Sequence, residues 1–158
     1  MADAKQAKAK KVYKDMVRAL KAKNWHFIEK EEKLMIVSKY TGDDLPVNFT
    51  ISIDADKEVI LYLSPLTFKI DKAKRVDAAV AVCVANYGLV NGSFDMDISD
   101  GEIRYRLTTS FYDCDLGKDF FYNMMATAVL TTDKYNDWFK KLNDGTMTLQ
   151  QFIEKRKL

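Results

Sequence analysis

The chain has 158 residues, of which 47% are hydrophobic and 30% are charged, and its formal net charge is +2 at pH 7. These values are typical of one globular domain, expected here over residues 1–158, and exclude a disordered chain or a polyelectrolyte. The charged N-terminus has no secretory signal and no apolar run is long enough to cross a bilayer. We therefore expect a cytoplasmic protein without membrane contact.

The first segment, residues 3–23, is predicted to form an amphipathic helix. Val12, Met16 and Leu20 fall on one helical face, and the opposite face is rich in lysine. A basic face of this kind is either solvated or contacts nucleic acid or another anionic surface. No groove-reading module accompanies it, so nucleic acid is not the expected partner.

Residues 25–64 predict about four short strands of an antiparallel sheet. They cover residues 25–29, 33–40, 47–53 and 58–64. The third shows the alternation of a half-buried strand, and Pro65 is predicted to stop the fourth.

Three further helices are predicted. The first is capped by Asp71 and runs to about Tyr87. The second runs from about Gly117 to Asn143, either unbroken or divided near residues 131–133, and a short one covers residues 149–157. The helix that begins after Asp71 is expected to turn one apolar stripe to the core: Val76, Val80, Cys83, Val84 and Tyr87.

The stretch DMDISDGEIRYR, residues 95–106, begins like an EF-hand calcium loop. That loop needs glycine at its sixth position and glutamate at its twelfth, where this chain has Asp100 and Arg106. Asp100-Gly101 instead favours a two-residue type I′ hairpin turn. The register of this turn would form apolar pairs on one face and ion pairs on the other: Ile98–Ile103, Met96–Tyr105, Phe94–Leu107, Asp97–Arg104 and Asp95–Arg106.

No residue pattern predicts catalysis, and we expect no catalytic residue, no cofactor and no metal. His26 is the single histidine, and Cys83 falls on a helical stripe. Cys114 precedes a helix, but Asp113 and Asp115 flank it and oppose a thiolate. An enzyme with an unrecognised site remains the alternative.

The helix near residues 117–143 carries more large apolar side chains than one stripe facing a sheet accommodates. Either a protein interface or the short terminal helix, through Leu149, Phe152 and Ile153, covers the surplus. The partner would be another protein or a second copy of the chain. The residues expected at the interface are Phe121, Met125, Tyr135, Trp138 and Phe139.

The stretch NYGLVNGSFDMDISDGEIRYR resembles the YbjN-like family of bacterial proteins. In that family a helix ends at an asparagine, Gly-x-Phe opens a strand, and an acidic-Gly turn leads to an aromatic-Arg strand. The stretch LKAKNWHFIEKEEKLMIVSKYTGDDLPVNFTISID and the segment DKYNDWFKKLNDG are similar to the family's start and its closing helix. The matching positions of the first stretch are Asn86, Gly92, Phe94, Asp100, Gly101, Tyr105 and Arg106.

The resemblance implies an α+β fold similar to that of type III secretion chaperones, which are typically homodimers that bind extended segments of a partner. Its expected order is N-terminal helix, antiparallel sheet of about four strands, helix, β-hairpin, long helix and short C-terminal helix. YbjN-like proteins are assigned to sensory transduction regulation. The resemblance therefore implies a non-enzymatic protein that binds or regulates a protein partner.

Overall fold

The structure is a computed structural model that describes residues 2–157. Within them lie four α-helices and six β-strands. None of these helices is long and apolar enough to cross a lipid bilayer. In chain order the elements are α1 (Ala2–Ala22), β1 (Ile28–Lys30), β2 (Met35–Thr41), β3 (Pro46–Asp54), β4 (Val59–Lys69), α2 (Arg75–Asn86), β5 (Ser93–Asp97), β6 (Glu102–Ser110), α3 (Lys118–Asp144) and α4 (Leu149–Lys157), with short 3-10 turns at Glu31–Lys33 and Lys72–Lys74.

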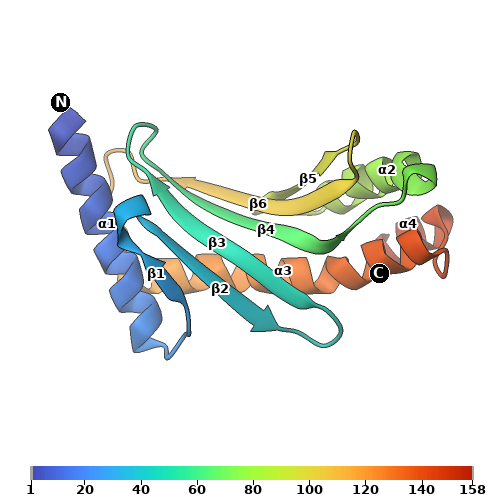
Figure 1. Ribbon diagram of the computed structural model, residues 1–158, viewed down its shortest axis with the longest axis horizontal. Helices are drawn as coiled ribbons and strands as arrows, with labels where there is room; N and C mark the ends of the chain where they lie inside the picture. The colour runs from blue at the N-terminus through green and yellow to red at the C-terminus, as the bar shows by residue number, and fades with distance from the viewer. Residues whose placement is uncertain (1, 158) are drawn as a thin grey trace.

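The six strands form one antiparallel sheet in the order β1-β2-β3-β4-β6-β5 (Figure 1). The expected count of about four was too low, because the hairpin β5–β6 joins the sheet beside β4. Strand β4 also continues through Pro65 to Lys69 instead of stopping before the proline. The pairing of β4 with β6 becomes irregular between Pro65 and Lys69, which is how a proline is accommodated inside a sheet.

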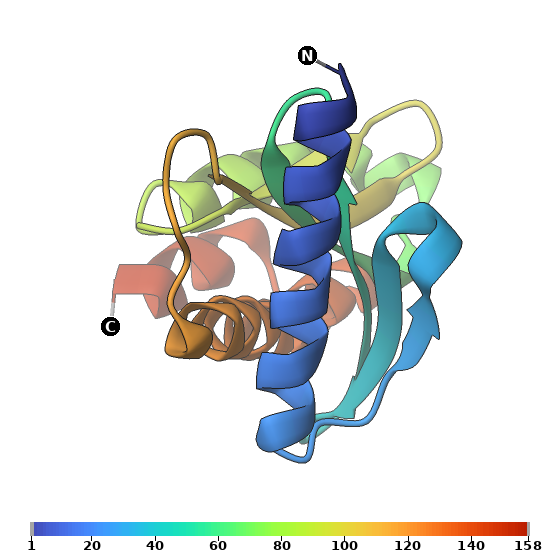
Figure 2. The ribbon, with the colours of Figure 1, turned by 90° about the vertical axis from the view of Figure 1, so that its left-hand side faces the viewer.

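The helices lie along one side of this sheet. α3 runs beneath the strands for most of the length of the molecule, and α2 and α4 lie together at the end away from α1 (Figure 1). Figure 2 shows α1 standing across the other end, beside the start of α3. The alternate residues Val47, Phe49, Ile51 and Ile53 of β3 are buried, as the alternation predicted.

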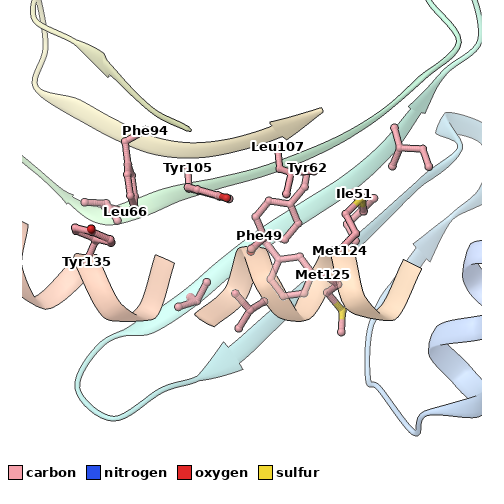
Figure 3. Packing of buried hydrophobic residues seen from close by; sticks show 14 of the residues in the cluster. Phe49, Ile51, Tyr62, Leu66, Phe94, Tyr105, Leu107, Met124, Met125 and Tyr135 are labelled. Atoms are coloured by element: carbon pink, nitrogen blue, oxygen red, sulfur yellow. The ribbon is translucent and has the colours of Figure 1, made fainter. Parts of the chain in front are cut away.

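Aromatic side chains from the sheet fill the space above α3. Phe49 stacks on Tyr62 with ring centroids 5.0 Å apart, and Phe94 meets the edge of Tyr105 at 5.2 Å (Figure 3). Met124 and Met125 of α3 close this layer from the helix side (Figure 3). This packing fixes α3 against the sheet, because a close-packed interior tolerates little change of volume.

The hairpin forms, but its register differs from the predicted one by two residues. Phe94 pairs with Tyr105 and Met96 with Ile103, and the connection has four residues, 98–101, in place of two. Because side chains alternate with a period of two, this shift keeps the side chains that remain paired on their predicted faces. Ile98, predicted to pair with Ile103, is 57% exposed in the turn.

Carboxylates inside the turn explain its greater width. The backbone N–H of Ser99 donates to Oδ1 of Asp97 at 2.9 Å, and the N–H of Glu102 donates to Oδ1 of Asp100 at 2.9 Å. The N–H of Gly101 donates to the carbonyl oxygen of Asp97 at 2.8 Å. These local bonds satisfy backbone groups that a two-residue turn would have paired across the strands.

The side chain of Asn86, the last residue of α2, pairs with the backbone of β5. Its Nδ2 donates to the carbonyl oxygen of Phe94 at 2.9 Å, and its Oδ1 accepts the N–H of Phe94 at 2.7 Å. The amide therefore takes the place that a neighbouring strand would have at the outer edge of β5, and it ties the end of α2 to the sheet.

Helix α2 begins later than predicted. A 3-10 turn over Lys72–Lys74 precedes it, and the side chain of Asp71 makes no capping hydrogen bond. The backbone N–H of Asp71 instead donates to Oδ1 of Asn143 at 2.8 Å, which links this segment to the end of α3.

Helix α3 is unbroken, which decides between the two alternatives for residues 117–143. The hydroxyls of Thr131 and Thr132 donate to the carbonyl oxygens of Thr127 and Ala128, so both threonines stay within the helix. The helix ends at Gly145, which has φ +78°. α4 follows at Leu149–Lys157, as predicted.

Candidate interaction surfaces

The five residues predicted at an interface on α3 are all buried within the chain. Their exposed fractions lie between 0% for Met125 and Phe139 and 7% for Trp138. Phe152 of α4 is fully buried against three of them, with its ring centroid 5.3 Å from Phe139, 5.5 Å from Trp138 and 6.4 Å from Tyr135. The terminal helix thus covers Tyr135, Trp138 and Phe139, as the alternative explanation expected. Phe121, near the start of α3, lies beside Ala19 and Ala22 of α1 instead. Contact of the five residues with a partner stays a prediction, and for Tyr135, Trp138 and Phe139 it would require α4 to move aside.

The exposed apolar residues gather on α2 instead. Val76 is 71% exposed, Val80 42% and Tyr87, directly after the helix, 88%, and Cys83 between them is also exposed. We call these four residues the α2 outer face. All four belong to the stripe that was predicted to face the core, so that prediction was wrong for them; Val84 alone packs partly against the core.

The buried side of α2 is made of smaller residues. Ala78, Ala81, Val82 and Ala85 are at most 9% exposed, and they recur with the spacing of one helical face. α2 contacts β5, α3 and α4 along this side. Small side chains let the helix approach β5 closely enough for Asn86 to reach the backbone of Phe94. The larger valines and Tyr87 consequently point outward.

Both ends of the α2 outer face are anchored to neighbouring segments. At the N-terminal end, Nη1 of Arg75 donates to the carbonyl oxygens of Ser99 at 2.6 Å and Ile98 at 3.3 Å, which holds the exposed Ile98 nearby. At the C-terminal end, the guanidinium of Arg156 lies over the ring of Tyr87, 5.2 Å from its centroid. The face is therefore a fixed surface on a packed helix.

Part of the basic face of α1 is neutralised within the chain. Lys5 and Lys8 lie 3.3 Å and 3.4 Å from the carboxylate of Glu58, which is only 6% exposed. Lys11 and Arg18 both contact Asp15. The pairs with Glu58 fasten α1 to the turn before β4, and all four pairs reduce the positive charge that an anionic partner would meet.

The residues weighed for catalysis belong to different segments: His26 precedes β1, Cys83 lies on α2 and Cys114 precedes α3. The carbonyl oxygen of His26 accepts a hydrogen bond from Oγ of Ser38 at 2.7 Å at the start of the sheet. Sγ of Cys114 donates to the carbonyl oxygen of Ser110 at 3.8 Å, in the loop before α3. Among residues 2–157, no three His, Cys, Asp or Glu side chains lie close enough together to hold a metal ion.

The carboxylates of the hairpin are held by the chain's own groups. Asp95 accepts hydrogen bonds from Nε and Nη2 of Arg106 at 2.7 Å and 3.1 Å, and these bonds lower the pKa of Asp95. Hydrogen bonds from Ser99 lower the pKa of Asp97, and one from Lys69 lowers that of Asp100. Each carboxylate is thus stabilised as an anion by donors that a metal ion would have to displace.

We accordingly expect no calcium binding at residues 95–106. Calorimetric titration with millimolar calcium should give no saturable heat, because the carboxylates lack the arrangement of an EF-hand and already accept these hydrogen bonds. The variant Asp97→Ala is the matched control and should give the same featureless titration. A stoichiometric isotherm for the wild type that disappears in Asp97→Ala would contradict this interpretation of the hairpin.

Comparison with known proteins gives similarity of fold at low sequence identity. No family model matches the sequence, and no curated protein matches it. A chain in the crystal structure of the ExsC–ExsE complex superposes with a TM-score of 0.55 at 14% identity, covering 80% of this chain and 92% of that one. YbjN from E. coli, a candidate transcription regulator, superposes with a TM-score of 0.56 at 11% identity, covering 75% and 84%. The similarity confirms the predicted YbjN-like, type III secretion chaperone-like α+β fold.

Proposed function

We propose that this chain is a non-enzymatic protein-binding protein with a regulatory role, acting as a single domain in the bacterial cytoplasm. The observation that carries the proposal is the α2 outer face, an apolar surface turned to solvent on a folded helix. Its partners are proteins, and a second copy of the chain is included among them. The recurrence of the fold in the ExsC–ExsE complex, a structure of two proteins bound together, supports this choice.

The energetics of the face favour a protein partner. Soluble monomers rarely leave a contiguous apolar patch of more than a few hundred Å² in water. Val76, Val80 and Tyr87 are well exposed although they follow one another along a single helix face. Burying apolar surface of this kind contributes roughly 25 cal/mol per Å² before the costs of association are subtracted. A partner that covers the face therefore gains a substantial part of its affinity there.

A photo-crosslinking experiment tests the proposal. A benzoylphenylalanine at position 87 keeps an aromatic ring on the α2 outer face, and the same residue at position 112 replaces Tyr112, which is 71% exposed in the loop before α3. Illumination of cells that produce each variant should give a discrete protein adduct at position 87 and none at position 112. Absence of a protein adduct at position 87, or equal labelling at both positions, would contradict a docking surface on α2.

A further inference from the structure

Strand β5 is shorter than its neighbour β6, and a pocket opens where β5 is missing. β5 begins at Ser93, which pairs with Arg106, so β6 beyond Arg106 has a neighbouring strand only on the β4 side. Leu107 and Thr109, which alternate on the face of β6 turned toward the helices, line this pocket. Asn91, in the connection between α2 and β5, lines it too. Figure 2 shows this connection and the start of α3 on the same side of the molecule.

One face of α3 forms the opposite wall of the pocket. Phe120, Asn123, Met124 and Thr127 line it and follow one another at the spacing of a helical face. Met124 is 6% exposed and Phe120 is half-buried, so both present apolar surface at the base of the pocket. The ring of Phe120 packs edge to face with that of the buried Phe121, with centroids 5.5 Å apart, and this contact holds its plane.

Charge and size limit what the pocket can hold. Among residues 2–157 no charged side chain lines it, whereas Lys14, Lys21 and Glu29 all line the pocket beside α1. A phosphate or carboxylate would therefore find no lysine or arginine to pair with. The volume is about 240 Å³, which is below the size of typical sites for drug-sized ligands. The pocket therefore suits a small, uncharged ring system.

The polar side chains of the pocket are free to bind a ligand. Within residues 2–157 the amides of Asn91 and Asn123 and the hydroxyls of Thr109 and Thr127 have no hydrogen-bond partner, although all four line the same space. The hydroxyl of Thr131, one turn further along α3, instead donates to a carbonyl oxygen of the helix. An asparagine amide presents a donor and an acceptor side by side, so it pairs with a ligand edge that carries both.

We propose that this pocket binds an uncharged nucleobase, free or as the base of a nucleoside. The flat ring lies against Leu107, Phe120 and Met124, because π-systems pack well on aromatic rings and thioether sulfur. The polar edge of the base meets the amides of Asn91 and Asn123. A sugar fits less well, since its hydroxyls would lie unpaired against the apolar base of the pocket. The site is separate from the α2 outer face and does not depend on the proposed function.

Methionine methyl NMR of the intact chain tests binding directly. The methyl signal of Met124 should shift with at least one of adenine and uracil and saturate at millimolar concentration, the affinity expected of a ligand with so few atoms. Met124→Leu assigns this signal by removing it. Ribose at the same concentrations should leave the signal in place. A Met124 signal that responds to neither base, or that responds equally to ribose, would overturn the inference.

Two substitutions on the solvent-exposed side of α3 locate the site. Thr127→Phe fills the pocket and should abolish the saturable shift, and Asn123→Ala should weaken binding about fivefold, the factor that one hydrogen bond contributes. Asn48→Ala is the matched control, because Asn48 is exposed on β3, outside the pocket, and should bind as the wild type does. Circular dichroism verifies that each variant folds. Binding that survives both substitutions on α3 would place the base elsewhere and refute the proposal.

A phosphate on the ligand tests the uncharged lining. Adenosine monophosphate should bind no more tightly than adenosine at low and at high salt, because no lysine or arginine among residues 2–157 lines the pocket. If the monophosphate binds more tightly and its affinity falls as salt is added, the site recognises an anion and the proposed ligand class is wrong.

Discussion

Replacing Gly101 with valine should lower the free energy of unfolding by about 3 kcal/mol or more. Gly101 has φ +85°, a conformation that a β-branched residue adopts only with strain. A Cβ at this position would also lie 2.2 Å from the carbonyl oxygen of Ile70. The Ile70 N–H donates to the Gly101 carbonyl at 2.9 Å, so relief of this clash would disturb that bond between the hairpin and the end of β4.

Valine substitutions at two other glycines distinguish the cost of dihedral strain from the cost of steric overlap. Gly145 has φ +78° with open space around it, so Gly145→Val should cost only the strain, about 1–2 kcal/mol. Gly117 has φ −67° and no neighbour within 4 Å, so Gly117→Val should have little effect. Urea denaturation of the three variants measures their free energies of unfolding, which can then be compared. If Gly101→Val unfolds at the same midpoint as Gly117→Val, the hairpin turn is not where the structure places it.

Replacing Phe152 with alanine should cost about 3–5 kcal/mol of stability, the usual range for removing a buried phenylalanine ring. Phe152 is fully buried, and its ring centroid lies 5.3–6.4 Å from those of Phe139, Trp138 and Tyr135. It is the one buried residue of α4, so the cavity would also loosen the helix that covers the end of α3. Chemical denaturation followed by tryptophan fluorescence would report the loss near Trp138.

Ile153 provides the matched control for Phe152. It is the next residue on α4 and is only partly buried, so Ile153→Ala should cost much less. If Phe152→Ala and Ile153→Ala lose comparable amounts of stability, the buried position of the aromatic ring is unimportant. A loss below about 1 kcal/mol for Phe152→Ala would mean that α4 detaches before the rest of the chain unfolds.

The sequence predicts the order of the elements well because long, periodic segments define them. The alternation at residues 47–53 indicates a strand, and the apolar spacing of residues 117–143 indicates helix, although it leaves open whether that helix is divided. The hairpin register could not be predicted from turn propensity alone, since carboxylates at Asp97 and Asp100 accept bonds that stabilise a wider turn. The extent of β4 past Pro65 likewise depends on its pairing with β6.

The candidate surface could not be located from the sequence, for a specific physical reason. α2 has two apolar stripes with the same helical spacing, one of larger residues at positions 76, 80, 83 and 87 and one built mainly of alanine. Hydrophobicity alone predicts that the stripe of larger side chains faces the core. In the structure α2 lies close to β5, and the stripe of smaller side chains is the buried one. On α3, Phe152 of the same chain packs against Tyr135, Trp138 and Phe139, which is one of the two kinds of cover that the sequence left open.

The amide of Asn86 also limits what the sheet can do in an assembly. A strand from another molecule that approached β5 would find the N–H and carbonyl of Phe94 already bonded and would have to displace Asn86 first. Endless head-to-tail stacking requires an available edge on both sides of every subunit. Because Asn86 occupies the backbone of Phe94 on this edge, it opposes the continuous strand pairing through β5 that such stacking would need.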